Sequence, residues 1–98
     1  MEQEKVICNT PTPGKQPTRI DKWKYDIVAK AILNTLPRKG KGLPFRELPD
    51  KVKARLTKNE LQRLGSITWY TTAVKLDLEV KGKIERVEGE KPQRLISR

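Results

Sequence analysis

The chain has 98 residues, and its 22 lysines and arginines against 12 aspartates and glutamates give it a formal charge of +10. A chain of this length is expected to form one domain with a modest core. The charge favours a polyanionic partner, with nucleic acid ahead of an acidic membrane surface. Histidine is absent and cysteine occurs once, which argues against an internal disulfide, a structural zinc site and a bound cofactor.

The sequence contains no pattern typical of a membrane span or a secretory leader. Its longest apolar runs are three residues, as at 27–29 and 31–33, whereas a span needs about 20 apolar residues. The first five residues are polar and acidic rather than basic and then apolar. We therefore expect a cytoplasmic protein that does not enter a membrane.

Residues 1–20 are predicted to form an extended N-terminal arm that precedes a single domain over 21–98. Three prolines fall between positions 11 and 17, and each fixes φ, removes a hydrogen-bond donor and biases its predecessor away from helix. Only residues 6–8 are apolar enough to pack on the domain. Alternatively, Lys15 and Arg19 make this a basic arm that follows a DNA backbone or minor groove.

A first helix is predicted over 22–36, with Asp21 as its N-cap and Pro37 as its stop. One helical face carries the apolar residues Tyr25, Val28, Ala29, Ile32 and Leu36. The following loop, 38–42, has three cations in five residues. It is either a solvated connection or a phosphate clamp, because phosphate contacts need only reach and charge.

Two shorter helices follow a short strand at 43–45. The first is predicted over 47–56, with Pro49 tolerated in its first turn. Thr57 and Glu60 have the spacing of a capping box, which opens an extra short helix over 58–64.

A long helix over 66–81 is predicted to be the central element, with Ser66 capping its start and Gly82 ending it. One apolar stripe holds Ile67, Tyr70, Val74 and Leu78. A second stripe, on the opposite side, holds Trp69, Ala73, Leu76 and Val80. We expect such a helix to be buried on two sides, with one narrow polar strip facing outward. That strip holds Thr68, Thr71, Thr72, Lys75 and Glu79.

Two strand-like runs, 84–88 and 93–97, predict a C-terminal β-hairpin around Gly89. Three main helices, one extra short helix and this hairpin indicate an α+β, mainly α, winged helix-turn-helix domain. The tip of the hairpin carries Glu88, Glu90 and Lys91, a charge pattern that does not favour insertion of the tip into a DNA groove.

Residues 66–87 resemble a small, uncharacterised family of prokaryotic winged-helix proteins. The resemblance lies in residues 69–79, Trp-Tyr-Thr-Thr-Ala-Val-Lys-Leu-Asp-Leu-Glu, followed by Gly82, Ile84, Glu85 and Arg86. In addition, residues 9–15 look like the N-terminus of the same family. It implies the fold and no activity. The ending at 78–86 is also similar to that of winged-helix transcription regulators.

The first functional hypothesis is a DNA-binding winged helix, such as a transcription regulator or a nucleoid-associated protein, with double-stranded DNA as its partner. The long helix would present Thr68, Thr71, Thr72 and Lys75 to the major groove. Phosphate contacts would come from Lys41, Lys83, Arg86 and Arg94.

The alternative is a protein-interaction module, with a homodimer or partner surface formed by Trp69, Leu76 and Val80. Exposure of Trp69 would favour this alternative, whereas the expectation is that residues 6–20 bury it in the core. RNA binding stays open on charge alone. No enzyme and no small-molecule substrate is expected, because histidine is absent and Asp77 and Glu79 point about 200° apart on a helix.

Overall fold

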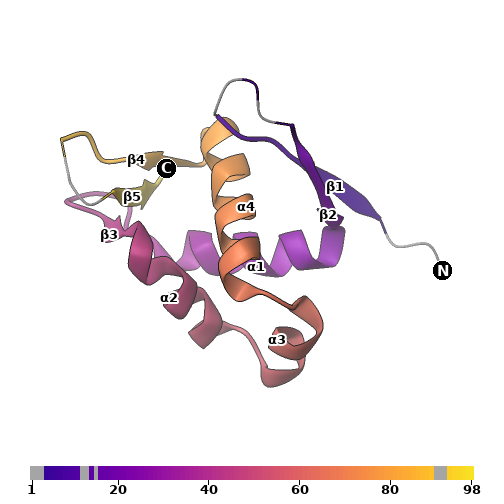
Figure 1. The fold of residues 1–98 in the computed structure, drawn as a ribbon. Helices are drawn as coiled ribbons and strands as arrows, with labels where there is room; N and C mark the ends of the chain where they lie inside the picture. Colours follow the sequence, from indigo (N-terminus) through magenta and orange to yellow (C-terminus); the bar gives the residue numbers. More distant parts are fainter. Residues whose placement is uncertain (1–3, 12–13, 15, 90–92) are drawn as a thin grey trace.

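The computed structural model describes residues 4–11, 14, 16–89 and 93–98. Its elements, in chain order, are β1 (Lys5–Cys8), β2 (Thr18–Asp21), α1 (Lys22–Thr35), β3 (Leu43–Pro44), the 3-10 turn η1 (Phe45–Glu47), α2 (Leu48–Arg55), α3 (Lys58–Leu64), α4 (Ile67–Val80), β4 (Ile84–Arg86) and β5 (Arg94–Ser97). Figure 1 shows α4 crossing α1 near the middle of the molecule, with a small sheet on either side. The described residues therefore form a small α+β fold.

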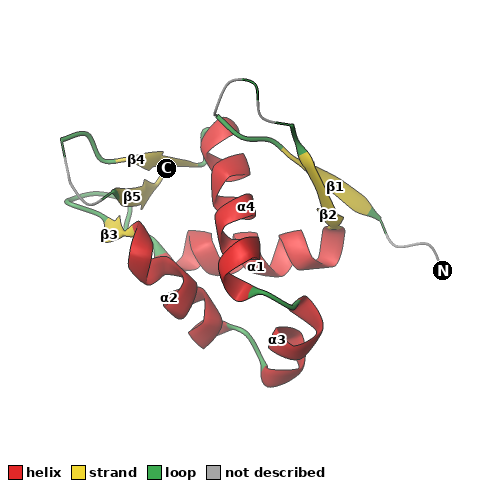
Figure 2. Cartoon of the chain, viewed as in Figure 1, coloured by secondary structure: helices red, strands yellow, loops and turns green. Residues whose placement is uncertain are grey.

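The strands form two separate antiparallel sheets (Figure 2). In the three-stranded sheet the order is β3-β5-β4, so the last strand lies between the other two. Leu95 of β5 pairs with Leu43 on one side and with Arg86 on the other. The predicted strand before the second helix thus joins the C-terminal hairpin. Glu90 and Lys91 of the predicted tip lie outside the described residues.

The second sheet is a β-hairpin in the region predicted to be an extended arm. Val6 pairs with Ile20 and Cys8 pairs with Thr18. Cys8 and Ile20 are each only 3% exposed, so their burial against the helices favours the strand pairing. The segment is extended as expected, but the pairing of its two halves was not predicted. Lys15, part of the alternative basic arm, lies outside the described residues.

Local sequence signals set the helix ends, and most act as predicted. The hydroxyl of Thr57 accepts from the Glu60 N–H at 3.1 Å, while the Glu60 carboxylate accepts from the Thr57 N–H at 2.8 Å, which confirms the capping box. Ser66 caps α4 by accepting from the Trp69 N–H. Asp21 precedes α1 without a side-chain capping bond. Its carboxylate pairs with Lys5 instead, because the hairpin brings these two residues together.

One hydrophobic core lies where α1, α2 and α4 meet the three-stranded sheet. Its fully buried apolar members come from all of these elements and from α3: Val28, Ile32, Leu48, Val52, Leu64, Val74, Leu78, Ile84 and Leu95. Among helix pairs, α4 packs most extensively against α1 and next against α2. Because α4 contacts both helices, two neighbouring arcs of its surface are covered, and this fixes which of its residues reach solvent.

Candidate functional site

The two apolar stripes of α4 differ in the solvent exposure of their large side chains. Val74 is 0% and Leu78 1% exposed, whereas Trp69 is 46% and Val80 47% exposed. The expectation that α4 is buried on two sides, with Trp69 in the core, is therefore wrong. The β1–β2 hairpin lies beside α4 (Figure 1). The groove between them is lined by Trp69, Ala73 and Leu76 of the second stripe, of which Ala73 and Leu76 are half-buried. We call the stripe formed by Trp69, Ala73, Leu76 and Val80 the outer face of α4.

The predicted polar strip does not face outward as a unit. Thr68 is exposed and Thr72 is half-buried, but Thr71 and Lys75 are 0% and 2% exposed. Their predicted orientation is wrong because they lie on the arc of α4 that faces the interior. The Lys75 ammonium lies 4.5 Å from the centre of the Phe45 ring in η1, so the segment before α2 covers it. In this structure Thr71 and Lys75 have no path to a major groove.

Lys75 belongs to a short chain of charges that joins α4 to β4. Its Nζ lies 2.8 Å from Glu79 Oε2, and Arg86 Nε lies 2.5 Å from Glu79 Oε1. Burial lowers the pKa of the Lys75 ammonium, and the bond to Glu79 opposes that effect. Since Glu79 also engages Arg86, the predicted phosphate ligand Arg86 is already paired within the protein.

The other predicted phosphate ligands lie elsewhere. Lys41 and Lys83 are exposed, and neither forms an ion pair with another described residue. The Arg94 guanidinium donates to the backbone oxygens of Lys41 at 3.0 Å and Gly42 at 3.2 Å. Arg94 thus holds the end of the α1–β3 loop. The structure does not bring the eight predicted residues together on one surface, and their DNA contacts stay a prediction.

A groove of about 330 Å³ runs between the N-terminal segment and the outer face of α4. The hairpin side contributes Cys8, Asn9, Thr10, Gln16 and Thr18, and α4 contributes Trp69, Thr72, Ala73 and Leu76. None of these lining residues is charged, although the chain carries +10. The sequence predicted the α4 half of the site and the packing of the N-terminal segment near Trp69, but it did not predict that this segment forms a hairpin that leaves Trp69 exposed. A signal for the hairpin was available in the alternation of Val6 with Cys8.

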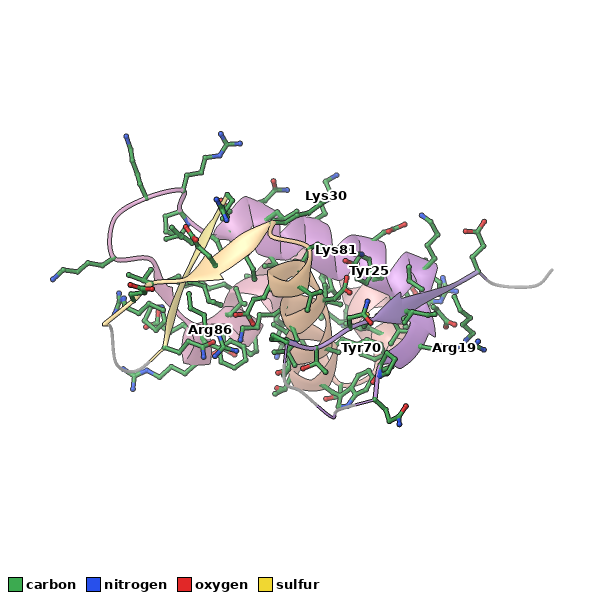
Figure 3. All side chains as sticks on the ribbon, turned by 90° about the horizontal axis from the view of Figure 1, so that it is seen from above. Arg19, Tyr25, Lys30, Tyr70, Lys81 and Arg86 are labelled. Carbon is green, nitrogen blue, oxygen red and sulfur yellow. The ribbon has the colours of Figure 1, made fainter. Side chains whose placement is uncertain are left out.

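Buried Asp77 fastens the hairpin to α4. Its carboxylate accepts from the Asn9 N–H at 2.9 Å and from the Tyr25 hydroxyl at 2.5 Å, and it pairs with Lys81 at 2.8 Å. Figure 3 shows Tyr25 and Lys81 together beside α4, where Lys81 also donates to the Tyr25 hydroxyl at 3.1 Å. Burial raises the pKa of Asp77, but these bonds outweigh it and hold the pKa below its usual value.

The same contacts affect the neighbouring titratable groups. Burial and the bond to Asp77 raise the pKa of Tyr25 to about 12. Burial, with the Asp77 charge, raises the pKa of the Cys8 thiol to about 11, so this thiol is protonated at neutral pH. Within the described ranges, no three His, Cys, Asp or Glu side chains are grouped as metal ligands would be.

The described helices are all too short or too polar to cross a membrane. Comparison with protein families matches residues 5–95 to the model of a family of unknown function. No curated protein and no solved structure matches the chain.

Proposed function

The chain belongs to the family of unknown function DUF6958, and we propose that it is a protein-interaction module with a winged-helix arrangement, which pairs with a second copy of itself through the outer face of α4. The observation that carries this proposal is the exposure of Trp69 and Val80, at 46% and 47%, on the helix at the centre of the fold. Large apolar side chains gathered on one exposed face mark interaction sites.

The order of the elements supports the winged-helix arrangement. A short strand, β3, separates α1 from α2, and the β4–β5 hairpin follows the long helix α4. The strand order β3-β5-β4 places this hairpin against the strand that precedes α2. The extra helix α3 lengthens the connection between α2 and α4 beyond the three or four residues of a simple helix-turn-helix.

The outer face carries a protrusion and a hollow side by side. Trp69 and Val80 protrude from α4, and the groove between α4 and the hairpin lies next to them. An isologous dimer requires one surface to be complementary to itself. A face with both features meets this requirement, because the Trp69 side chain of each copy can enter the groove of the other.

The spacing along α4 fits an antiparallel helix pair. Trp69 and Leu76 lie two turns apart, and Ala73 lies near the midpoint between them. A two-fold axis near Ala73 places the Trp69 of one copy against the Leu76 of the other. The small side chain at the crossing point allows the helix axes to approach to about 8 Å.

The charge of the contact surface is compatible with a second copy as the occupant. Two chains that each carry +10 repel one another at long range, an effect that salt screens, so the surfaces that meet must add no further like-charge contact. Among the described residues, the groove and the outer face contain no charged side chain. A protein partner that met this face through acidic side chains would find no cation among those lining residues to pair with.

The size of the face sets the expected affinity. The 14 residues of α4 span about 21 Å, and the helix together with two strands is roughly 20 Å wide. The resulting area of about 400 Å² is near half of the ~800 Å² that each partner contributes to a stable complex. We therefore expect a dimer that dissociates on dilution into the low micromolar range.

Sedimentation velocity tests the proposal across a range of protein concentrations. From about 1 to about 200 μM, at an ionic strength of about 0.15 M where long-range repulsion is screened, the wild type should shift from the 11.3-kDa monomer toward twice that mass. Leu76→Glu should remain monomeric, because each introduced carboxylate would be buried without a partner against the Trp69 of the other copy. Val80→Glu should weaken the dimer in the same direction.

Asn34→Glu provides the matched control, since it introduces the same charge at an exposed site on α1 away from the outer face. It should dimerise like the wild type. Circular dichroism checks that each variant is folded. A wild type that stays monomeric over the whole range, or a Leu76→Glu variant that dimerises as well as Asn34→Glu, would overturn the proposal.

A further inference from the structure

The positive charge of the chain is concentrated in one segment. Residues 38–58 contain eight of the 22 basic residues and two of the 12 acidic residues, so this segment accounts for six of the ten net positive charges. It comprises the α1–β3 loop, β3, η1, α2 and the start of α3. The basic residues are Arg38, Lys39, Lys41, Arg46, Lys51, Lys53, Arg55 and Lys58.

All eight of these side chains are exposed. None of them forms an ion pair with a residue in the described part of the chain, where the six ion pairs involve basic residues outside the segment. Among the described residues, the one hydrogen bond that these eight side chains donate runs from Arg55 Nε to the Thr35 hydroxyl at 2.7 Å. These cations therefore face solvent without neutralising partners among the described residues, while much of the charge elsewhere is paired.

The seam between α1 and α2 brings part of this charge together. A hollow of about 410 Å³ is lined by Thr35 and Leu43, the two ends of the α1–β3 connection, and by Lys51 and Arg55 of α2. A second hollow, of about 240 Å³, shares Arg55, continues along α1 to Lys30 and is also lined by Glu60 of α3. Lys51 and Arg55 are one helical turn apart on the same face of α2. We call this surface, with the adjoining loop cations, the basic seam.

We propose that the basic seam binds the phosphate backbone of double-stranded DNA without reading its sequence. Lysine and arginine donors form charge-assisted bonds to phosphate oxygens, and such contacts orient a protein on a duplex without specifying bases. The loop that carries Arg38, Lys39 and Lys41 would reach one strand of the duplex. Adjacent phosphates would be held by Lys51 and Arg55. The groove on α4 shares no lining residue with the seam, so the two surfaces can act at the same time.

The side chains around the seam favour a duplex over an acidic membrane. Amphipathic surfaces that anchor in a bilayer combine basic residues with exposed apolar or aromatic residues that insert below the headgroups. The exposed large hydrophobic residues in the described ranges are Ile7, Trp69 and Val80, and all three lie on β1 or α4. None of the described residues that line the two hollows of the seam is aromatic, so they offer no platform on which unpaired bases could stack, which argues against single strands.

The test is fluorescence anisotropy of a labelled mixed-sequence duplex of about 20 base pairs, titrated with the full chain over a series of salt concentrations. The wild type should bind with a log–log salt slope of several counterions. The triple variant Arg38→Ala, Lys39→Ala, Lys41→Ala should bind at least ~10-fold more weakly, with a slope smaller by about three. Its two loop glycines are unchanged and its three side chains are exposed, so its fold should be retained.

A second triple variant removes the same charge elsewhere. Arg19→Ala, Lys83→Ala, Arg98→Ala changes three exposed cations outside residues 38–58, and its affinity should stay within about threefold of the wild type, because only direct phosphate contacts release counterions. Lys51→Ala should weaken binding in the direction of the loop variant.

Three results would overturn the proposal. The first is absence of duplex binding at low salt. The second is an equal loss of affinity in the two triple variants, which would show that duplex binding depends on net charge alone and not on the seam. The third is binding to vesicles that contain phosphatidylserine with no binding to the duplex.

Discussion

Asp77, on the buried side of α4, accepts a hydrogen bond of 2.9 Å from the backbone N–H of Asn9, just after β1. These residues are 68 positions apart in the sequence. The bond fixes the N-terminal hairpin beside α4, and it thereby forms one wall of the groove. A buried carboxylate needs hydrogen-bond or charged partners, and the Asn9 N–H is one partner of Asp77. Displacing the hairpin would remove this partner and so destabilise the domain.

We predict that Asp77→Ala destabilises the protein by about 3 kcal/mol, since it removes a charged acceptor from buried donors. Urea unfolding provides the measurement. Hydrogen exchange should show in addition that the β1 amides lose protection before those of α1. Asp26→Ala is the control, because Asp26 pairs with Lys22 in an exposed i,i+4 bridge that water and salt screen, so that its loss should have little effect on stability. Equal losses in the two variants would contradict the assigned role of Asp77.

A pH dependence follows from the depressed pKa of Asp77 in the folded protein. The unfolded chain binds this proton near pH 3.9, so the stabilisation is fully present above that value and is lost as pH falls through the lower folded pKa. The difference in free energy of unfolding between wild type and Asp77→Asn should therefore be constant near neutral pH and shrink below about pH 4. A difference that does not change down to pH 2 would be inconsistent with an ionised Asp77.

The helices were predictable because their signals are local. The Thr57–Glu60 capping box, the Ser66 cap and the glycine at 82 lie within a few residues of the ends that they define. Periodicity also identified the two apolar stripes of α4. It could not tell which stripe is covered, since both are equally apolar and the answer depends on where α1, α2 and the hairpin pack.

The hairpin and the interior position of Lys75 required tertiary information. The strands at 5–8 and 18–21 pair across a nine-residue connection whose prolines dominate the local pattern. Lys75 looked like a surface cation, but its aliphatic stem can be buried when its charge is paired. The Glu79 carboxylate four residues later was the available sign of that pairing.

We predict that Lys75→Met stays within about 1 kcal/mol of the wild type, because methionine fills the same space beside Phe45 without the cost of burying a charge. Glu79 retains Arg86 as a partner. Lys75→Ala should instead leave a cavity and cost about 2–4 kcal/mol. Thermal unfolding separates the two variants. Comparable losses in both would indicate that the buried charge itself is required.

Gly42 is expected to be irreplaceable where β3 meets β5. Its φ is +75°, and a Cβ there would lie 2.5 Å from the backbone oxygen of Leu95. Gly42→Ala should cost about 3 kcal/mol from strain and displacement of the strand. Gly40→Ala is the matched control, since Gly40 has φ +88° but no atom within 4 Å of the added carbon. Its cost should be about 1 kcal/mol. Denaturant titration of both variants checks this difference, and equal costs would contradict the close approach.

The most direct test of the central claim is the fluorescence of Trp69 itself. The chain has two tryptophans, so a Trp23→Phe background leaves Trp69 as the single reporter. If the outer face of α4 pairs with a second copy, Trp69 emission should shift to shorter wavelength as concentration rises from about 1 to about 200 μM, and acrylamide quenching should fall, because dimerisation transfers an amphipathic ring from water into the interface. The same background with Leu76→Glu should show neither change. Emission and quenching that are independent of concentration would contradict the proposed interface.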